Sequence, residues 1–299
     1  MKYRTKLWTS ISAAALIAAS SAVAGMASPS AGEGAGNGSR GDALQGKQAS
    51  GSFLMASAGE GEGGEGGEGG EGGEGGEGGE GGVDPAAAAK DPAVYLSAID
   101  IIRAHYLAGE AMLDVEGGRR EGGAMFAHPI SEVYIDLESV FEAQGAPLFM
   151  DEMTEAVDLA LGDAPVAEVK ASVRKVYAAL DAAAAKAPEN GKSEAAIEVA
   201  LAAEMFDRAA KQYDTAVGPN GSTEAWIDGY GFWKVAKMRA DALKPSLQGE
   251  HESLAEELAS AEELFAKAYA SVEKPEEAPV DTGSLLAASS RISLKTSSF

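Results

Sequence analysis

The chain has 299 residues, a formal charge of −23, no cysteine and only three histidines. A surface this negative repels phosphate backbones and anionic lipid headgroups, so binding to nucleic acid or to a membrane surface is disfavoured. The absence of cysteine excludes disulfides, thiolate nucleophiles, iron–sulfur clusters and cysteine-based zinc sites.

Residues 1–24 have the form of a secretory signal peptide. Lys2, Arg4 and Lys6 make a basic start, residues 7–23 are apolar and rich in alanine and serine, and Ala22-Val23-Ala24 is a small-residue cleavage site. The alternative is a retained membrane anchor, but the apolar stretch is short for a span of about 20 residues. We therefore expect a periplasmic or secreted protein with no membrane span in the mature chain.

Residues 25–90 are of low complexity. Glutamate recurs at every third position from Glu62 to Glu80, and each is followed by two glycines. No proline occupies this repeat, which argues against a collagen helix. A glycine-rich, like-charged segment is typical of a flexible, extended linker, so we predict disorder here.

Residues 91–271 are predicted to form a helical bundle. Asp91 followed by Pro92 is a strong helix start, because aspartate caps a helix and proline fits its first position. Apolar residues then recur at steps of three and four, with turn residues between the runs and no alternating pattern typical of strands. The prediction is an all-α, up-and-down bundle of about six or seven helices. Residues 272–299 are polar, then serine-rich, and are predicted to be a disordered tail.

His105 lies within the first predicted helix on an apolar face, so its side chain should point inward. It is either a buried histidine bonded to a neighbouring helix or a ligand to a metal ion or haem iron. His128 precedes Pro129, and Glu132 follows one helical turn later. An imidazole with a carboxylate is a partial site for iron, zinc or manganese, whereas a capping histidine with solvated acids is the alternative.

Antiparallel packing of these two helices would bring His105 and His128 to one cavity. The predicted metal site is therefore His105, His128 and Glu132, for an ion such as iron. The two imidazoles alone could instead ligate a haem from opposite faces. Further along, residues 226–233 concentrate aromatic side chains, which indicates core packing or the wall of a pocket for a planar ligand.

Enzyme signatures are missing from the sequence. It contains no nucleophile elbow, phosphate-binding loop, dinucleotide fingerprint or His-Glu-x-x-His motif. We therefore expect a binding protein and not an enzyme.

The combination of signal peptide, alanine-rich helices and an early histidine-plus-carboxylate segment resembles the imelysin-type envelope proteins. This resemblance implies a helical bundle and a link to the uptake of iron or other metals. The family's Gly-x-His-x-x-Glu motif is matched here only at His105, because Arg103 and Ala108 occupy the glycine and glutamate positions. The sequence also resembles uncharacterised bacterial envelope proteins that carry a Gly/Glu tether. The shared segment includes His128, Pro129, Glu132, Tyr134, Leu137 and Glu138.

Two functional hypotheses follow. The first is a non-enzymatic envelope protein that binds a metal ion or haem through His105, His128 and Glu132. The second is an acidic helical adaptor that docks another envelope protein.

Overall fold

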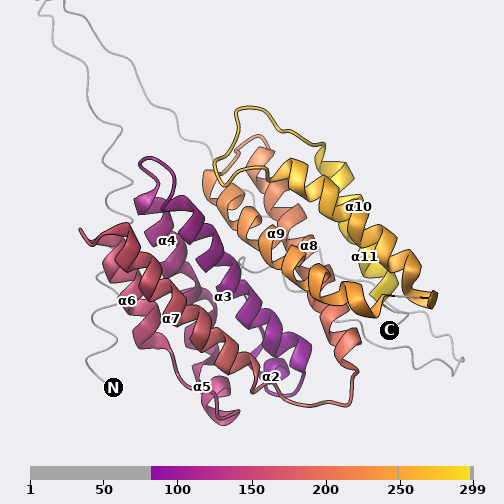
Figure 1. Cartoon of the computed structure of the whole chain (residues 1–299), viewed down its shortest axis with the longest axis horizontal. Helices are drawn as coiled ribbons and strands as arrows, with labels where there is room; N and C mark the ends of the chain where they lie inside the picture. The colour runs from indigo at the N-terminus through magenta and orange to yellow at the C-terminus, as the bar shows by residue number, and fades with distance from the viewer. Residues whose placement is uncertain (1–81, 248, 297–299) are drawn as a thin grey trace, which may run out of the picture. The chain divides into compact units, whose positions relative to one another are not determined.

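A computed structural model of the chain describes residues 82–247 and 249–296, all within one compact unit. This part is all-α, as predicted, and none of the residues it covers forms a strand (Figure 1). The predicted signal peptide and nearly all of the predicted linker lie outside the described residues.

The first group of helices covers residues 85–184. Its helices α3, α4, α6 and α7 form a closed ring in which each contacts the next, and α2 and α5 pack at one end. The elements are α2 (Pro85–Ala88), α3 (Pro92–Met112), α4 (Arg119–Pro129), the π-helix η1 (Ile130–Tyr134), α5 (Ile135–Ala143), α6 (Met150–Leu161) and α7 (Val166–Ala184).

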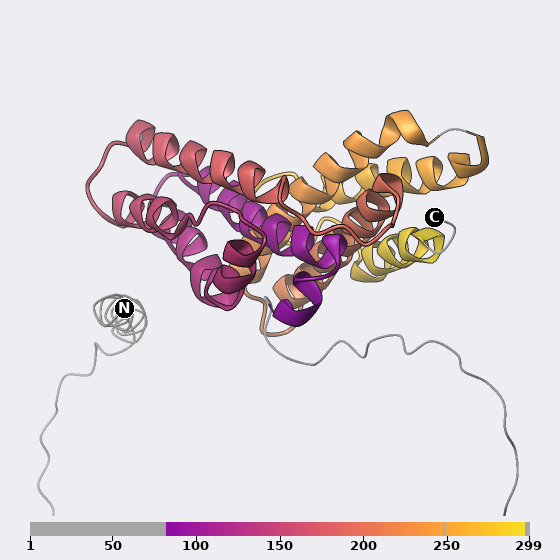
Figure 2. The same cartoon turned by 90° about the horizontal axis from the view of Figure 1, so that it is seen from below.

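The second group repeats this four-membered ring with α8, α9, α10 and α11. The two groups appear in indigo to pink and in orange to yellow in Figure 2, and they meet where α3 packs against α8 and α9. The elements are α8 (Glu194–Val217), α9 (Thr223–Leu243), the 3₁₀ turns η2 (Lys244–Ser246) and η3 (Gly249–His251), α10 (Glu252–Ala268) and α11 (Thr282–Thr296).

The predicted helix start at Asp91 is confirmed. The Asp91 carboxylate accepts a hydrogen bond from the Ala93 amide, and Pro92 occupies the first turn of α3. Ser193 and Ser222 cap α8 and α9 in the same way, through their hydroxyl oxygens. These caps satisfy amide donors that have no partner within the helix.

A buried ion pair ties the two groups together. Arg239 of α9 donates two hydrogen bonds of 2.8 Å to the buried Asp100 carboxylate of α3 and one of 2.7 Å to Glu198 of α8. Burial raises the pKa of Asp100, although the Arg239 guanidinium opposes this by favouring the carboxylate. Removing one partner of such a pair leaves the other charge buried, so the pair fixes how α3 meets α8 and α9.

The aromatic segment of residues 226–233 is core, as the simpler interpretation predicted. Trp226 is buried against Tyr213 and Tyr269. Trp233 is buried against Phe206 and Phe265. Their packing joins α8, α9 and the end of α10 around a shared aromatic centre.

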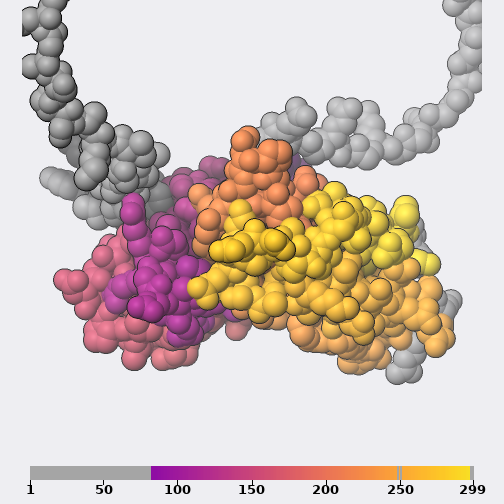
Figure 3. Space-filling view, turned by 90° about the horizontal axis from the view of Figure 1, so that it is seen from above, coloured from indigo at the N-terminus to yellow at the C-terminus, as the bar shows by residue number. Residues whose placement is uncertain are grey.

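The predicted disordered tail is wrong for residues 282–296, which form α11. Leu285, Ala288 and Ile292 are buried along one face of this helix, which packs against α8 and α10. In Figure 3 the yellow C-terminal residues form a continuous surface with their orange neighbours. Disorder was predicted because this segment is rich in serine. In the helix, serine hydroxyls such as those of Ser290 and Ser293 donate to backbone carbonyl oxygens one turn earlier.

Two smaller expectations also change. The last residues of the predicted linker are folded, since Asp84 caps the short helix α2. The described residues contain nine helices of nine or more residues, more than six or seven, because α11 exists and the π-turn divides α4 from α5. Among the described helices, none combines the length and the apolar character needed to cross a membrane.

Candidate metal site

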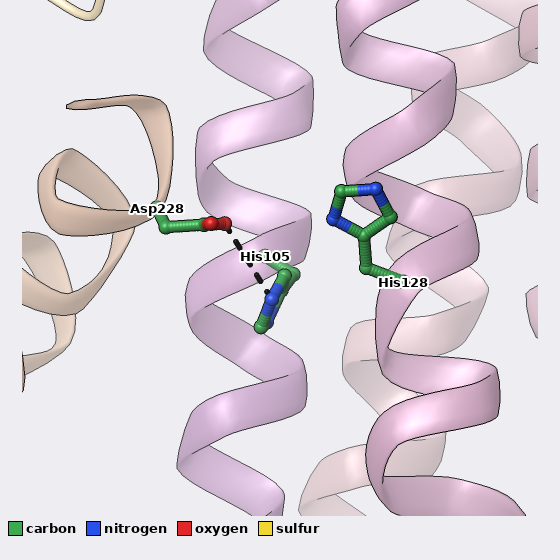
Figure 4. A group of neighbouring side chains, drawn as sticks. All are labelled: His105, His128 and Asp228. Carbon is green, nitrogen blue, oxygen red and sulfur yellow. Dashed lines mark ion pairs between the residues drawn. The ribbon is translucent and has the colours of Figure 1, made fainter. Parts of the chain in front are cut away.

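Three side chains from three helices converge where the two groups meet. His105 of α3, His128 of α4 and Asp228 of α9 each place one ligand atom within 4.8 Å of the others. In Figure 4, Asp228 and His128 approach His105 from opposite sides. The convergence of His105 and His128, expected from antiparallel packing, is confirmed: their ring centroids lie 6.2 Å apart.

His105 is held in one orientation by its own helix. Its Nδ1 lies 2.8 Å from the carbonyl oxygen of Ile101, one turn earlier, so Nδ1–H donates to that oxygen. The proton on Nδ1 leaves the lone pair of the neutral ring on Nε2, which faces the cluster. The ring is only 4% exposed and meets Phe232 edge to face.

Asp228 reaches the cluster because α9 approaches α3 closely. A Cβ atom added to Gly231 would collide with the carbonyl oxygen of Ala104, and one added to Gly229 would collide with the hydroxyl of Tyr269. Asp228 belongs to the aromatic core segment and is only 4% exposed, which is unusual for a carboxylate. Gly231, three residues after Asp228, therefore lets α9 approach α3 closely enough for the Asp228 carboxylate to sit beside the buried His105.

His128 and Glu132 lie at the π-turn that follows α4. Pro129 has no amide hydrogen, so the regular hydrogen-bond ladder is interrupted at this point. The chain continues through η1, where the Ile135 amide donates to the Ile130 carbonyl oxygen five residues earlier. π-Turns within helices occur often at functional sites, where they re-aim side chains. Here the π-turn carries Glu132, whose Oε2 lies 3.6 Å from His105 Nε2.

The distances from His105 Nε2 to its two carboxylate neighbours are longer than most hydrogen bonds. His105 Nε2 lies 3.5 Å from Asp228 Oδ1 and 3.6 Å from Glu132 Oε2. An N–H···O hydrogen bond spans about 2.7–3.2 Å. Two ligands bound tetrahedrally at about 2.1 Å from one ion are separated by about 3.4 Å. Each pair distance is close to this value, but only His105, His128 and Asp228 place their ligand atoms within 4.8 Å of one another.

The side chains of the cluster and its neighbour Glu224 range from buried to exposed. His105 and Asp228 are buried, His128 is 24% exposed, and Glu224 of α9 is 60% exposed. Glu224 Oε1 lies 3.6 Å from His128 Nε2. On another side, the buried apolar side chains of Ala108, Met112, Met125, Ile227 and Val272 pack together. Solvent therefore reaches the cluster from the side of Glu224 and His128.

Two of the three predicted ligands lie in this cluster. His105 and His128 belong to the three-residue cluster, whereas Glu132 lies beside His105 but outside that trio, and Asp228 takes the third place. Sequence reasoning missed Asp228 because residues 226–233 were interpreted by their aromatic side chains. The sequence does contain a signal for Asp228, because this single acidic residue follows Trp226 and Ile227 in an apolar segment. A charge buried in such a segment is costly unless it has a partner.

A haem between the two histidines does not fit. Axial ligation needs a flat slot for the porphyrin between the rings. The helices that carry the rings touch one turn away from His105: a Cβ atom added to Gly109 would lie 2.8 Å from the Gly122 carbonyl oxygen. This close contact between α3 and α4 leaves no flat slot for a porphyrin one turn from His105.

The fold and the cluster together define an all-α, double-ring helical bundle with a histidine-and-carboxylate group between its halves. No family model matches the chain, and neither a curated protein nor a solved structure matches it. The resemblance to imelysin-type proteins therefore stays a prediction.

Proposed function

We propose that this protein is a non-enzymatic envelope protein that binds a divalent metal ion through His105, His128 and Asp228, with Glu132 beside them. The observation that carries the proposal is the convergence of one ligand atom from each of His105, His128 and Asp228 within 4.8 Å. Export rests on the predicted signal peptide, and a binding role rests on the missing catalytic motifs.

Electrostatics support a cation in this position. With its proton on Nδ1, His105 presents an electron pair to two carboxylate oxygens at 3.5 and 3.6 Å. A cation beside these carboxylates would be stabilised by them in this partly buried site. Either a metal ion or a second proton on the ring would supply this positive charge, and the convergence of His128 on the same point supports the metal ion.

The ligand types limit the choice of ion. Two imidazoles with carboxylates suit iron, zinc or manganese, whereas copper(I) prefers sulfur ligands and calcium prefers oxygen ligands alone. Of the four methionines of the first helix group, Met112 and Met125 are packed into the apolar cluster. We therefore expect Fe²⁺, Zn²⁺ or Mn²⁺ and not copper(I).

The proposal is tested by titrating Zn²⁺ and Mn²⁺ into untagged, metal-depleted protein by calorimetry. His105→Ala and Asp228→Asn should each weaken binding by more than about 100-fold, because outer-shell partners alone are worth about 10–100-fold. His251→Ala is the matched control, since His251 is the third histidine and lies at η3, outside the cluster.

Unchanged affinity in the His105→Ala variant would end the assignment. If the wild-type protein binds neither ion, His105 is instead a protonated ring between two carboxylates. An acidic adaptor that docks another envelope protein would then become the leading interpretation.

A further inference from the structure

A cavity of about 550 Å³ lies where the turn after α3 meets the loop after α10. Figure 1 shows both connections at the same end of the helices that they join. The start of α9 forms a third side of the cavity. Pockets that bind ligands have volumes of about 300–1,000 Å³. This cavity is therefore large enough to receive side chains of another molecule.

The floor of the cavity is apolar. It consists of Met112, Val115, Ile227 and Val272. Three of these side chains belong to one buried cluster, and Val115 is partly buried against it. Because the floor is the surface of a packed core, an apolar side chain placed on it would be removed from water at little cost in reorganisation.

The rim of the cavity is acidic. Four exposed glutamates lie around the apolar floor, two from each connection: Glu116, Glu121, Glu273 and Glu276. Within the part of the chain that the structure describes, none of these four carboxylates takes part in an ion pair. The cavity thus combines an apolar floor with negative charges that the described residues do not neutralise.

The nearest basic side chains point to other contacts. Lys274 lines the cavity, but a Cβ atom added to Gly221 would lie 2.8 Å from its Nζ, so the ammonium group lies beside the turn that precedes α9. Arg119 donates hydrogen bonds of 2.7 Å to the carbonyl oxygens of Leu159 and Ala160 of α6. Neither cation therefore compensates the four glutamates.

A second cavity, of about 490 Å³ between α3, α7 and α9, provides a contrast. It is lined by lysines as well as by acidic residues. Lys170 lies 2.7 Å from Asp114, and Lys237 lies 2.7 Å from Asp241. There the protein supplies its own positive charges, whereas at the glutamate rim they are left to solvent or to a partner.

We propose that the cavity with the glutamate rim is a docking site for a basic peptide segment of a partner protein, in which an apolar side chain is flanked by lysines or arginines. The apolar side chain would cover the floor, and the basic side chains would reach the carboxylates. Complementary charges of this kind favour association and select the partner. This site is separate from the proposed metal site and does not require a bound ion.

The distribution of the carboxylates favours a peptide over a small cation. Glu116 and Glu121 lie on the segment between α3 and α4, whereas Glu273 and Glu276 lie on the loop after α10. Several cationic groups held apart by one backbone can meet both segments and still place an apolar group between them. A single cation without an apolar part would leave the floor exposed.

The proposal is tested by fluorescence anisotropy with the metal-depleted mature chain and a fluorescein-labelled peptide, Lys-Arg-Trp-Leu-Arg-Lys. The salt concentration is 0.15 M, where the Debye length of about 8 Å screens long-range attraction to the net charge. Two comparison peptides replace either Trp-Leu by Ser-Gly or the four basic residues by glutamate. The parent peptide should bind at least about 10-fold more tightly than either, because each comparison peptide lacks one of the two complementary features.

Two pairs of substitutions separate the rim from the overall charge. Glu116→Gln combined with Glu273→Gln removes one carboxylate from each connection and should weaken binding at least about 5-fold. Glu142→Gln combined with Glu256→Gln is the matched control, because both glutamates are exposed and neither lines the cavity. The control changes the net charge equally and should bind within about 2-fold of wild type. Circular dichroism checks that both double variants keep the fold.

Three results would overturn the proposal. Equal losses in the two double variants would mean that the peptide responds only to net charge. Equal binding of the Ser-Gly peptide would mean that the apolar floor is not used. Spermidine binding as tight as that of the parent peptide would identify the ligand as a small cation. Because the chain is metal-depleted in these measurements, failure of the proposed metal site would leave their outcome unchanged.

Discussion

His105 shows how one backbone contact prepares a side chain for its role. The Ile101 carbonyl oxygen accepts the Nδ1 proton at 2.8 Å, so the ring is oriented before any ligand arrives. In a helix this carbonyl already accepts an amide hydrogen bond, and it shares its second lone pair with the imidazole. Little conformational entropy then remains to be lost when an ion binds at Nε2.

Tyr95 allows a residue-level prediction about pH. Its ring is buried, and its hydroxyl donates a 3.0 Å hydrogen bond to the Ala183 carbonyl oxygen of α7. Burial raises the pKa of Tyr95 to about 12, whereas an unfolded tyrosine ionises near 10. The unfolded state therefore loses this proton first, and folding stability should fall as the pH rises from 10 to 12.

The Tyr95→Phe variant tests this link by urea unfolding at pH 8, 10 and 11. At pH 8 it should be less stable by about 1 kcal/mol, the typical net value of one hydrogen bond. Between pH 10 and 12 its stability should fall less steeply than that of wild type, by up to about 1.4 kcal/mol per pH unit. Parallel pH profiles for the two proteins would show that Tyr95 does not contribute to this loss.

At the level of helices, glycine contacts set the distance between α3 and its neighbours. Gly231 of α9 lies against Ala104 of α3, and Gly109 of α3 lies against Gly122 of α4. His105 lies between these two contacts along α3, so the separations of its ligands depend on both.

The Gly231→Ala variant should therefore affect stability and binding together. The added methyl group meets the Ala104 carbonyl oxygen, which is backbone and cannot move aside alone. We expect a loss of about 1–3 kcal/mol in unfolding free energy, as for other overpacked sites, and weaker metal affinity. Gly82→Ala, where nothing lies within 4 Å, should change stability by less than about 0.5 kcal/mol. Metal affinity equal to wild type in Gly231→Ala would contradict the positioning role of this contact.

Helix α11 offers a matched pair of apolar residues two positions apart. Ile292 is fully buried, whereas Leu294 is 76% exposed. Ile292→Ala should cost about 2–5 kcal/mol in unfolding free energy because it leaves a cavity. Leu294→Ala should cost less than about 0.5 kcal/mol. Equal, small effects measured by thermal or urea unfolding would mean that α11 does not pack as described.

The elements that the sequence predicted best were those with strong local signals. Asp91 and Pro92 begin a helix whatever surrounds them, because capping involves only neighbouring residues. Helix α11 was missed because its apolar residues, Leu285, Ala288 and Ile292, are few and lie among serines. Its stability comes from contact with α8 and α10, which no local pattern reports.

At the scale of the whole molecule, sequence reasoning reached the fold class but not the division into two rings. Consecutive helices joined by short loops predict antiparallel neighbours, so the approach of His105 to His128 could be anticipated. The approach of Asp228 to His105 could not, because it depends on α9 packing against α3 across more than a hundred residues of chain. The buried contacts of Arg239 with Asp100 and Glu198 fix that pairing, and they too are visible only in three dimensions.

The π-turn at Ile130–Tyr134 affects the whole continuous helical segment from Arg119 to Ala143, which consists of α4, η1 and α5. An unbroken α-helix rotates by about 100° per residue, so the direction of His128 would dictate the direction of every later side chain. The wider turn resets this angular phase. The first half can then place the His128 imidazole beside His105 and Asp228, while Leu137 and Phe141 in the second half are buried in the interior. Inserting or deleting one residue at this point would change the direction of the side chains in one half of the helical segment and leave those of the other half unchanged.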